Sequence, residues 1–148
     1  APYNIGKVLS TGMDVAGGFA WQSGDCKCSF DAKYTLLSAV DKTPDSYSYG
    51  QQIPFIAKHT LVFNAAASWK GWALTPVWQM RAGRTDGSGV VDDWNTLNLT
   101  LSKDIKLPKT GPLSLKLSVR NLTDCRYEVS SGYPMPGRNF NIGVELKF

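Results

Sequence analysis

The last eleven residues of the chain, RNFNIGVELKF, alternate between polar and apolar side chains as far as the final residue. A period of two is typical of an extended strand, because successive side chains point to opposite faces. The ends of most domains fray unless something ties them down. The alternation therefore predicts a terminal strand with one apolar face, which needs a protein core or lipid beside it. That face holds Phe140, Ile142, Val144, Leu146 and Phe148.

The same alternation recurs in six earlier segments, and no segment has a helical period. These segments are residues 13–21, 30–36, 61–69, 72–80, 97–105 and 113–119. Together with the terminal strand they predict an all-β chain of about seven long strands.

Short and long connections alternate between the predicted strands. The short ones are residues 22–27, 69–72 and 107–113, and the long ones are 41–56, 83–92 and 127–137. In the second short connection, Lys70 and Gly71 between two tryptophans are typical of a two-residue hairpin. This order predicts an antiparallel up-and-down arrangement with short turns at one end and long loops at the other.

Such a pattern is typical of an outer-membrane barrel, whose lipid-facing apolar band is about 25 Å tall. The outward residues of the terminal strand span roughly 20 Å at the usual tilt. A soluble β-sandwich also has one apolar face per strand. However, the predicted strands exceed the usual length of about five or six residues, and their opposite faces are rich in Lys, Asp, Asn, Ser and Thr. We therefore predict a transmembrane β-barrel.

Aromatic residues at the strand ends are candidates for the membrane-interface girdles of such a barrel, because a ring with a polar group suits that boundary. The candidates at the short-turn end are Trp21, Trp69 and Trp72, and those at the long-loop end are Trp94, Tyr127 and Tyr133.

Composition argues against several functions. The net charge of +4 is scattered without a run of Lys and Arg, so no nucleic-acid partner is expected. Three cysteines and one histidine do not supply a metal site, and we expect free or loosely paired thiols and no cofactor. His59 has no evident Ser or Asp partner, so we do not expect an enzyme.

About seven strands cannot close a barrel, because bacterial single-chain barrels have an even number of strands from eight upward. Unpaired edge groups in lipid cost several kcal/mol each. Either residues 1–12 contain an eighth strand, which gives a small complete barrel with an adhesin or structural role, or the chain is the C-terminal part of a larger barrel. We expect the second arrangement.

The last quarter of the chain resembles the C-terminus of TonB-dependent outer-membrane transporters. The resemblance lies in NLxDxxY (residues 121–127), GYPxPGR (132–138) and the alternating strand that ends in Phe. DWxxLNL (93–99) resembles the preceding strand of the family. NxGK (4–7) and GMD (12–14) are a weaker match, since Val8 and Asp14 replace the usual Ala and Glu. The resemblance covers essentially the whole chain, with its specific motifs after residue 92.

This resemblance implies that residues 1–148 are the last third of a 22-stranded barrel, with the N-terminal strands and the plug domain absent. It implies active transport of a ferric siderophore, haem or cobalamin across the bacterial outer membrane, energised through TonB. The implied partners are the rest of the barrel and its plug, the TonB complex through the absent N-terminal part, outer-membrane lipid and the barrel-assembly machinery. That machinery would read Phe148 as an assembly signal. A surface lipoprotein is a further candidate partner.

Ligand contacts in such a transporter would come from polar or aromatic residues of the three long loops. Arg138 has a second interpretation, as a structural clamp on Asp104, Glu145 or loop carbonyls. The candidate ligand residues are Tyr47, Tyr49 and Gln51 in the first loop, Arg84 and Asp86 in the second, and Tyr133 and Arg138 in the third.

Overall fold

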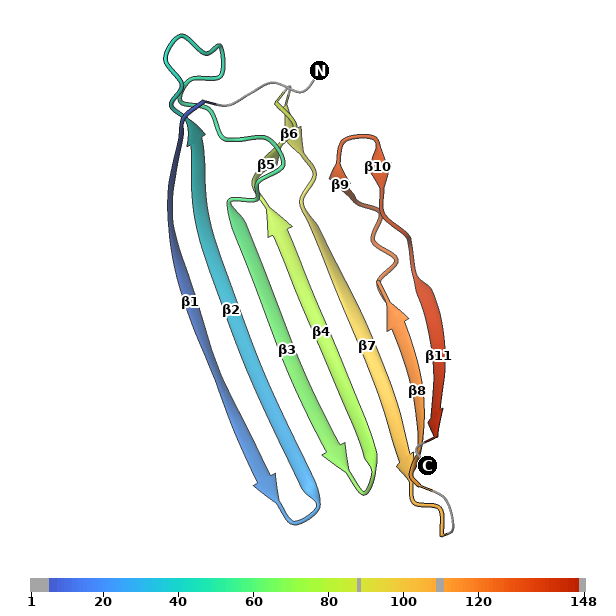
Figure 1. Cartoon of the computed structure of the whole chain (residues 1–148). Coiled ribbons are helices and arrows are strands. Elements are labelled where there is room, and N and C mark those ends of the chain that lie inside the picture. Colours follow the sequence, from blue (N-terminus) through green and yellow to red (C-terminus); the bar gives the residue numbers. More distant parts are fainter. Residues whose placement is uncertain (1–5, 88, 109–110, 147–148) are drawn as a thin grey trace.

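The computed structural model describes residues 6–87, 89–108 and 111–146. Seven long strands form one antiparallel sheet in the order β1-β2-β3-β4-β7-β8-β11 (Figure 1). The strands are β1 (Val8–Ser23), β2 (Cys26–Asp41), β3 (His59–Trp69), β4 (Trp72–Ala82), β7 (Trp94–Ile105), β8 (Leu113–Arg120) and β11 (Asn139–Leu146). The prediction of an all-β chain with about seven long antiparallel strands is confirmed. No helix in the described part of the chain is long and apolar enough to cross a membrane.

Short turns lie at one end of the sheet and long loops at the other, as the spacing of the strands predicts (Figure 1). Two of these loops contain a small hairpin of their own. These hairpins pair β5 (Arg84–Thr85) with β6 (Val90–Val91) and β9 (Glu128–Ser130) with β10 (Tyr133–Pro134). The chain reaches the short-turn end with β11, and Phe148, the predicted assembly signal, lies outside the described residues.

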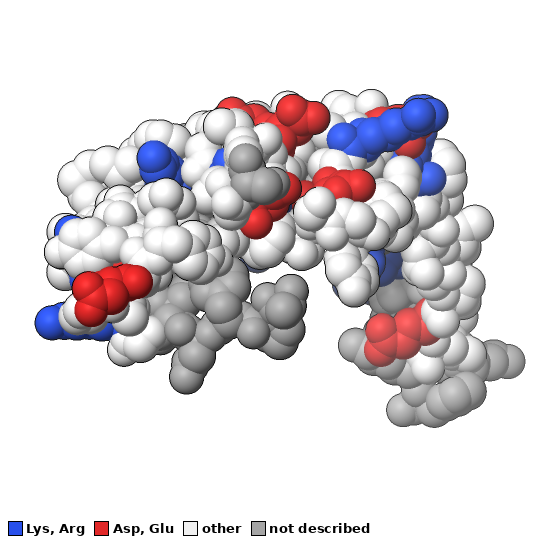
Figure 2. Space-filling view, turned by 90° about the horizontal axis from the view of Figure 1, so that it is seen from above, with Lys and Arg blue, Asp and Glu red and all other residues white. Residues whose placement is uncertain are grey.

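The sheet is curved and open. Seen from above, it arches around a concave side (Figure 2). β1 and β11 are its two edges, and in the described residues they do not pair with each other. Because Val8 already belongs to β1, the described part of residues 1–12 does not supply a separate eighth strand. The sheet is that of part of a barrel.

The β3–β4 turn is the two-residue hairpin that the sequence predicts, with Trp69 paired to Trp72. Lys70 and Gly71 have φ values of 46° and 79°, as the hairpin turn requires. The turn also docks onto the end of β7, because the Asp104 amide donates to the Gly71 carbonyl at 2.7 Å. A Cβ on Gly71 would lie 2.7 Å from the Asp104 carbonyl oxygen, so glycine alone fits both the backbone angle and the contact.

The two faces of the sheet differ in chemistry. One face is apolar and exposed, with Phe140, Ile142 and Val144 at 69%, 79% and 68% exposure. A row of rings crosses it from β1 to β4, with centroid separations of 5.9, 5.8 and 5.4 Å. A sandwich would bury such a face against a second sheet, whereas among the described apolar residues only Ala39 and Trp94 are buried. The rings are Phe19, Phe30, Phe63 and Trp78.

The opposite, concave face is polar and its side chains hydrogen-bond across the strands. Asn64 donates to Asp31 at 2.8 Å, and Gln79 donates to Thr96 at 3.1 Å. Further along the sheet, the Ser114 hydroxyl donates to Asp104 at 2.6 Å. These cross-strand bonds satisfy polar groups on the side that faces the interior of the curve.

Candidate functional site

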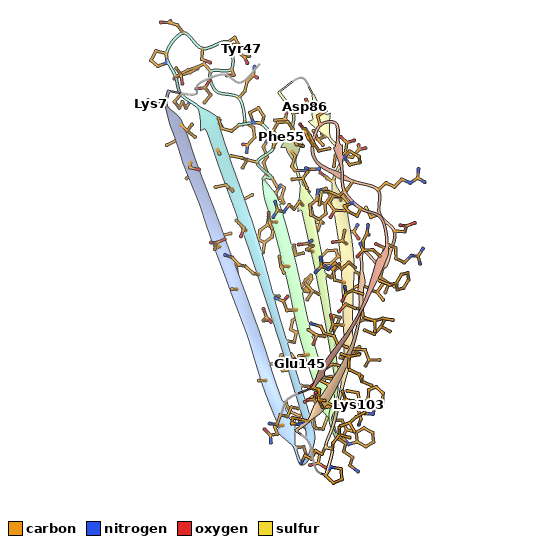
Figure 3. All side chains as sticks on the ribbon, turned by 45° about the vertical axis from the view of Figure 1, so that its right-hand side comes forward. Lys7, Tyr47, Phe55, Asp86, Lys103 and Glu145 are labelled. Carbon is orange, nitrogen blue, oxygen red and sulfur yellow. The ribbon has the colours of Figure 1, made fainter. Side chains whose placement is uncertain are left out.

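The three long loops meet at one end of the sheet and are joined by hydrogen bonds. We refer to residues 42–58, 83–93 and 121–138 as loops A, B and C. The Phe55 amide in loop A donates to the Thr85 carbonyl in loop B at 2.7 Å. Figure 3 shows Phe55 and Asp86 close to each other at this end, with Tyr47 further out. The loops therefore form one connected layer above the sheet.

Arg84 joins loop B to loop C. Its Nη1 donates to the carbonyls of Glu128 and Val129 at 2.9 and 3.2 Å, and its Nη2 donates to the Asp92 carbonyl at 2.9 Å. Burial lowers the pKa of Arg84, with a further contribution from the positive charge of Arg81, but an arginine remains protonated in proteins. Since Arg84 is only 3% exposed, the prediction that it presents its guanidinium to a ligand from a loop surface is corrected. It is a clamp between loops.

Trp94 packs beneath this clamp. It is 6% exposed, and its ring lies 4.3 Å from that of Tyr127. The guanidinium carbons of Arg81 and Arg84 lie 5.8 and 5.9 Å from the centre of a Trp94 ring, within cation–π distance. Trp94 is two residues from Thr96 and shares its polar, concave face. The prediction of Trp94 as a lipid-facing girdle residue is therefore wrong, and its partner Tyr127 packs inside with it.

The NLxDxxY motif builds loop C. Asn121 is 4% exposed and has a positive φ of 51°. Its side-chain amide donates to the carbonyls of Cys125 and Pro136 at 2.8 and 3.3 Å, and its side-chain oxygen accepts from the Cys125 amide at 3.0 Å. Its own amide donates to Asn98 at 2.9 Å. The side chain thus closes the turn and holds the two ends of loop C together, and the backbone amide of Asn121 ties the loop to β7.

Asp124 completes this arrangement by capping the return of loop C to β11. One carboxylate oxygen accepts from the Arg138 amide at 2.7 Å, and the other lies 3.9 Å from the Arg138 guanidinium. Arg138 therefore pairs with Asp124, and the expected pairing with Asp104 or Glu145 is corrected. The two motifs that carry the family resemblance meet here, and their contacts are structural.

Replacing Asn121 by alanine should loosen loop C, because the three hydrogen bonds of its side chain are removed and the carbonyls of Cys125 and Pro136 lose this donor. We expect a loss of about 2–3 kcal/mol in local stability, seen as faster amide hydrogen exchange across residues 121–138. Asn139→Ala is the matched control, since Asn139 is exposed and its side chain donates to the Gly137 carbonyl at 3.0 Å. Equal exchange in the two variants would contradict the role of Asn121.

Loop A carries the most accessible of the predicted ligand residues. Tyr47 and Tyr49 are 77% and 57% exposed, and the Lys42 ammonium lies 4.9 Å from the centre of the Tyr49 ring. The base of the loop is held by Asp41, which is 2% exposed and accepts from the hydroxyls of Ser46 and Ser48, each at 2.6 Å. In loop C, Tyr133 is also 72% exposed.

Two grooves lie where loops B and C meet the concave face. The upper groove has a volume of about 680 Å³ and lies between the two loops. The lower groove, of about 510 Å³, lies on the concave face. Tyr127 and Met135 line both, so the two grooves adjoin between the loops and the sheet, and both carry polar side chains. Of the predicted ligand residues, only Arg84 lines either groove. The other residues that line the two grooves were not predicted as ligand residues. They include Asp92, Arg126 and Glu128 above, and Gln79, Thr96 and Asn98 below.

The short-turn end of the apolar face carries three of the predicted girdle residues. Trp21, Trp69 and Trp72 are 55%, 55% and 45% exposed, so their rings are accessible to lipid, as a girdle requires.

The three cysteines are free thiols. Among the described residues, no three His, Cys, Asp or Glu side chains are placed to hold a metal ion.

A curved antiparallel sheet with an exposed apolar outer face, a hydrogen-bonded polar inner face and its long loops at one end belongs to the outer-membrane class of β-barrels. Residues 1–122 match the family described as TonB dependent receptor-like, beta-barrel, and the chain belongs to this family. It is a transporter family of the outer membrane of Gram-negative bacteria. The match ends before the GYPxPGR motif and the terminal strand. No curated protein matches the chain significantly.

Proposed function

We propose that the chain forms the last third of the barrel of a transporter that imports a scarce, bulky nutrient of the ferric siderophore, haem or cobalamin class, with energy supplied through TonB. The observation that carries this proposal is the pair of adjoining grooves on a receptor-family barrel sheet. One groove lies between loops B and C, the other lies on the concave face, and they share Tyr127 and Met135. Nutrients of this class are bulky and carry charged or polar groups, which the polar side chains of such grooves can receive.

In this proposal side chains of the three loops make the first contact with the nutrient. Tyr47, Tyr49 and Tyr133 supply accessible rings, and Gln51, Asp86 and Arg138 supply polar groups. The buried Arg84 keeps loops B and C together, so that the groove between them keeps its shape. The plug domain would fill the concave side, and its rearrangement would open a path.

The test is an uptake experiment in the bacterium that carries the gene for the whole protein. Disruption of the gene should abolish uptake of one labelled nutrient among ferric siderophores, haem and cyanocobalamin. The same uptake should be lost when the tonB gene is disrupted, because the energy comes from the inner membrane. Unchanged uptake of all three classes after disruption of the gene would contradict the proposed substrate class. Uptake that persists without TonB would contradict the energy source.

A further inference from the structure

Lys103 is the one charged residue on the outward face of β7, a strand that the structure describes throughout. It pairs with Trp72 of β4 and Leu115 of β8, and Leu115 pairs in turn with Val144 of β11. A cation thus stands in a row of apolar side chains on the face that the family exposes to lipid. A charge on that face is unfavourable near the centre of the membrane and tolerated near the membrane–water boundary. Lys103 must therefore lie near that boundary or have a counter-charge beside it.

The Lys103 ammonium turns toward the short-turn end, near which Figure 3 labels it. It donates to the Lys70 carbonyl at 2.8 Å and lies 4.8 Å from the centre of the Trp72 ring. Lys70 belongs to the same turn, and its ammonium lies 5.1 Å from the Trp69 ring. Two cations, each held over a tryptophan, therefore lie at one turn.

An apolar groove of about 550 Å³ begins beside these cations and runs across β7 and β8 to β11. The outward positions of β4, β7, β8 and β11 carry no acidic residue within the described bounds of these strands. An ammonium has three N–H donors, and the Lys70 carbonyl takes one of those of Lys103. The charge at the mouth of the groove is thus positive, and the groove itself suits a hydrocarbon chain. Its lining includes Trp72, Leu101, Lys103, Leu115, Ile142 and Val144.

We propose that this surface binds one phospholipid with an anionic headgroup, in the membrane leaflet next to the short turns. Lys103 and Lys70 contact the phosphate, the rings of Trp69 and Trp72 lie at the headgroup level, and one acyl chain occupies the groove. A cation beside an apolar groove is complementary to an anionic amphiphile, whereas a free phosphate has no apolar part that could fill the groove. The inference requires the barrel to lie in a membrane, but it does not depend on which nutrient is transported.

The test uses the full-length protein, purified and placed in nanodiscs of phosphatidylcholine with a minor fraction of phosphatidylglycerol. Native mass spectrometry then counts the lipids that remain bound. The parent should retain phosphatidylglycerol in preference to phosphatidylcholine. Lys70→Gln combined with Lys103→Gln should lower the retained phosphatidylglycerol at least fivefold. Lys42→Gln is the matched control, because Lys42 also lies over an aromatic ring, at 4.9 Å, but at the long-loop end.

Val144→Trp provides an independent variant that keeps both lysines and fills the groove. It should also lower retention of phosphatidylglycerol. If the double lysine variant does not assemble, this variant alone tests whether the groove binds the lipid. The proposal is overturned if the lysine and Val144 variants retain as much phosphatidylglycerol as the parent. It is equally overturned if Lys42→Gln loses as much as the double variant, or if the parent retains both lipids equally. A transporter that fails the uptake test can still pass this one, so the two results are separable.

Discussion

Replacing Arg84 by leucine is expected to separate loops B and C while leaving the sheet intact. The guanidinium is 3% exposed and donates to three backbone carbonyls, two in loop C and one in loop B. Leucine fills part of the space but leaves these carbonyls without their donor. Hydrogen bonds to a charged group contribute about 1.5–3 kcal/mol each. Because the three bonds are not additive, we expect a local loss on the order of 3–5 kcal/mol.

The measurement is limited proteolysis of the full-length protein, with cleavage sites mapped to residues 83–93 and 121–138. Arg84→Leu should raise cleavage in both loops, whereas cleavage in loop A should change less. Arg138→Leu is the matched control, because the Arg138 side chain is 45% exposed and its one ion pair is 3.9 Å long. Such an exposed pair contributes at most about 1 kcal/mol. If the two variants are cleaved alike, Arg84 is not the clamp between the loops.

The strands could be predicted from the sequence because each strand has one apolar face and one polar face along most of its length. The side chains therefore alternate with a period of two. Leu113, Leu115 and Leu117 alternate with polar residues and pair in register with the alternating residues of β11. The face of Trp94 could be predicted in the same way. Its position two residues before Thr96 puts it on the polar face of β7. The girdle prediction followed the general preference of tryptophan for membrane boundaries and not this alternation.

The role of Arg84 could not be predicted in this way. In the sequence it is a polar residue in a long connection, which usually means exposure to water. Its burial depends on carbonyls at residues 92, 128 and 129, which approach it because two separate loops fold over the same strand ends. The carboxylate partner of Arg138 was mispredicted for a similar reason. Its partner Asp124 lies in the same loop and not on a neighbouring strand. Loop contacts have no period that the sequence could reveal.

The assignment of the two faces can be tested with a pair of adjacent substitutions in the middle of β3. Phe63 lies on the apolar face, with its ring 5.8 Å from that of Phe30 and 5.4 Å from that of Trp78. Asn64, the next residue, lies on the concave face and donates to Asp31 at 2.8 Å. Arginine at either position adds the same positive charge. The two variants therefore differ mainly in the medium that receives the charge.

Phe63→Arg should destabilise the barrel by about 2–4 kcal/mol, the cost of an arginine on the lipid face near the membrane centre. Removal of the ring pairs with Phe30 and Trp78 should add about 0.5–1.5 kcal/mol for each pair. Asn64→Arg should change the stability by less than about 1 kcal/mol, because the guanidinium meets water and the Asp31 carboxylate. Denaturant titration of the full-length protein in lipid vesicles measures both values. The reverse order of stability would show that the faces are inverted. Equal small effects would show that neither face meets lipid, and the sheet would then need a protein partner over its apolar side.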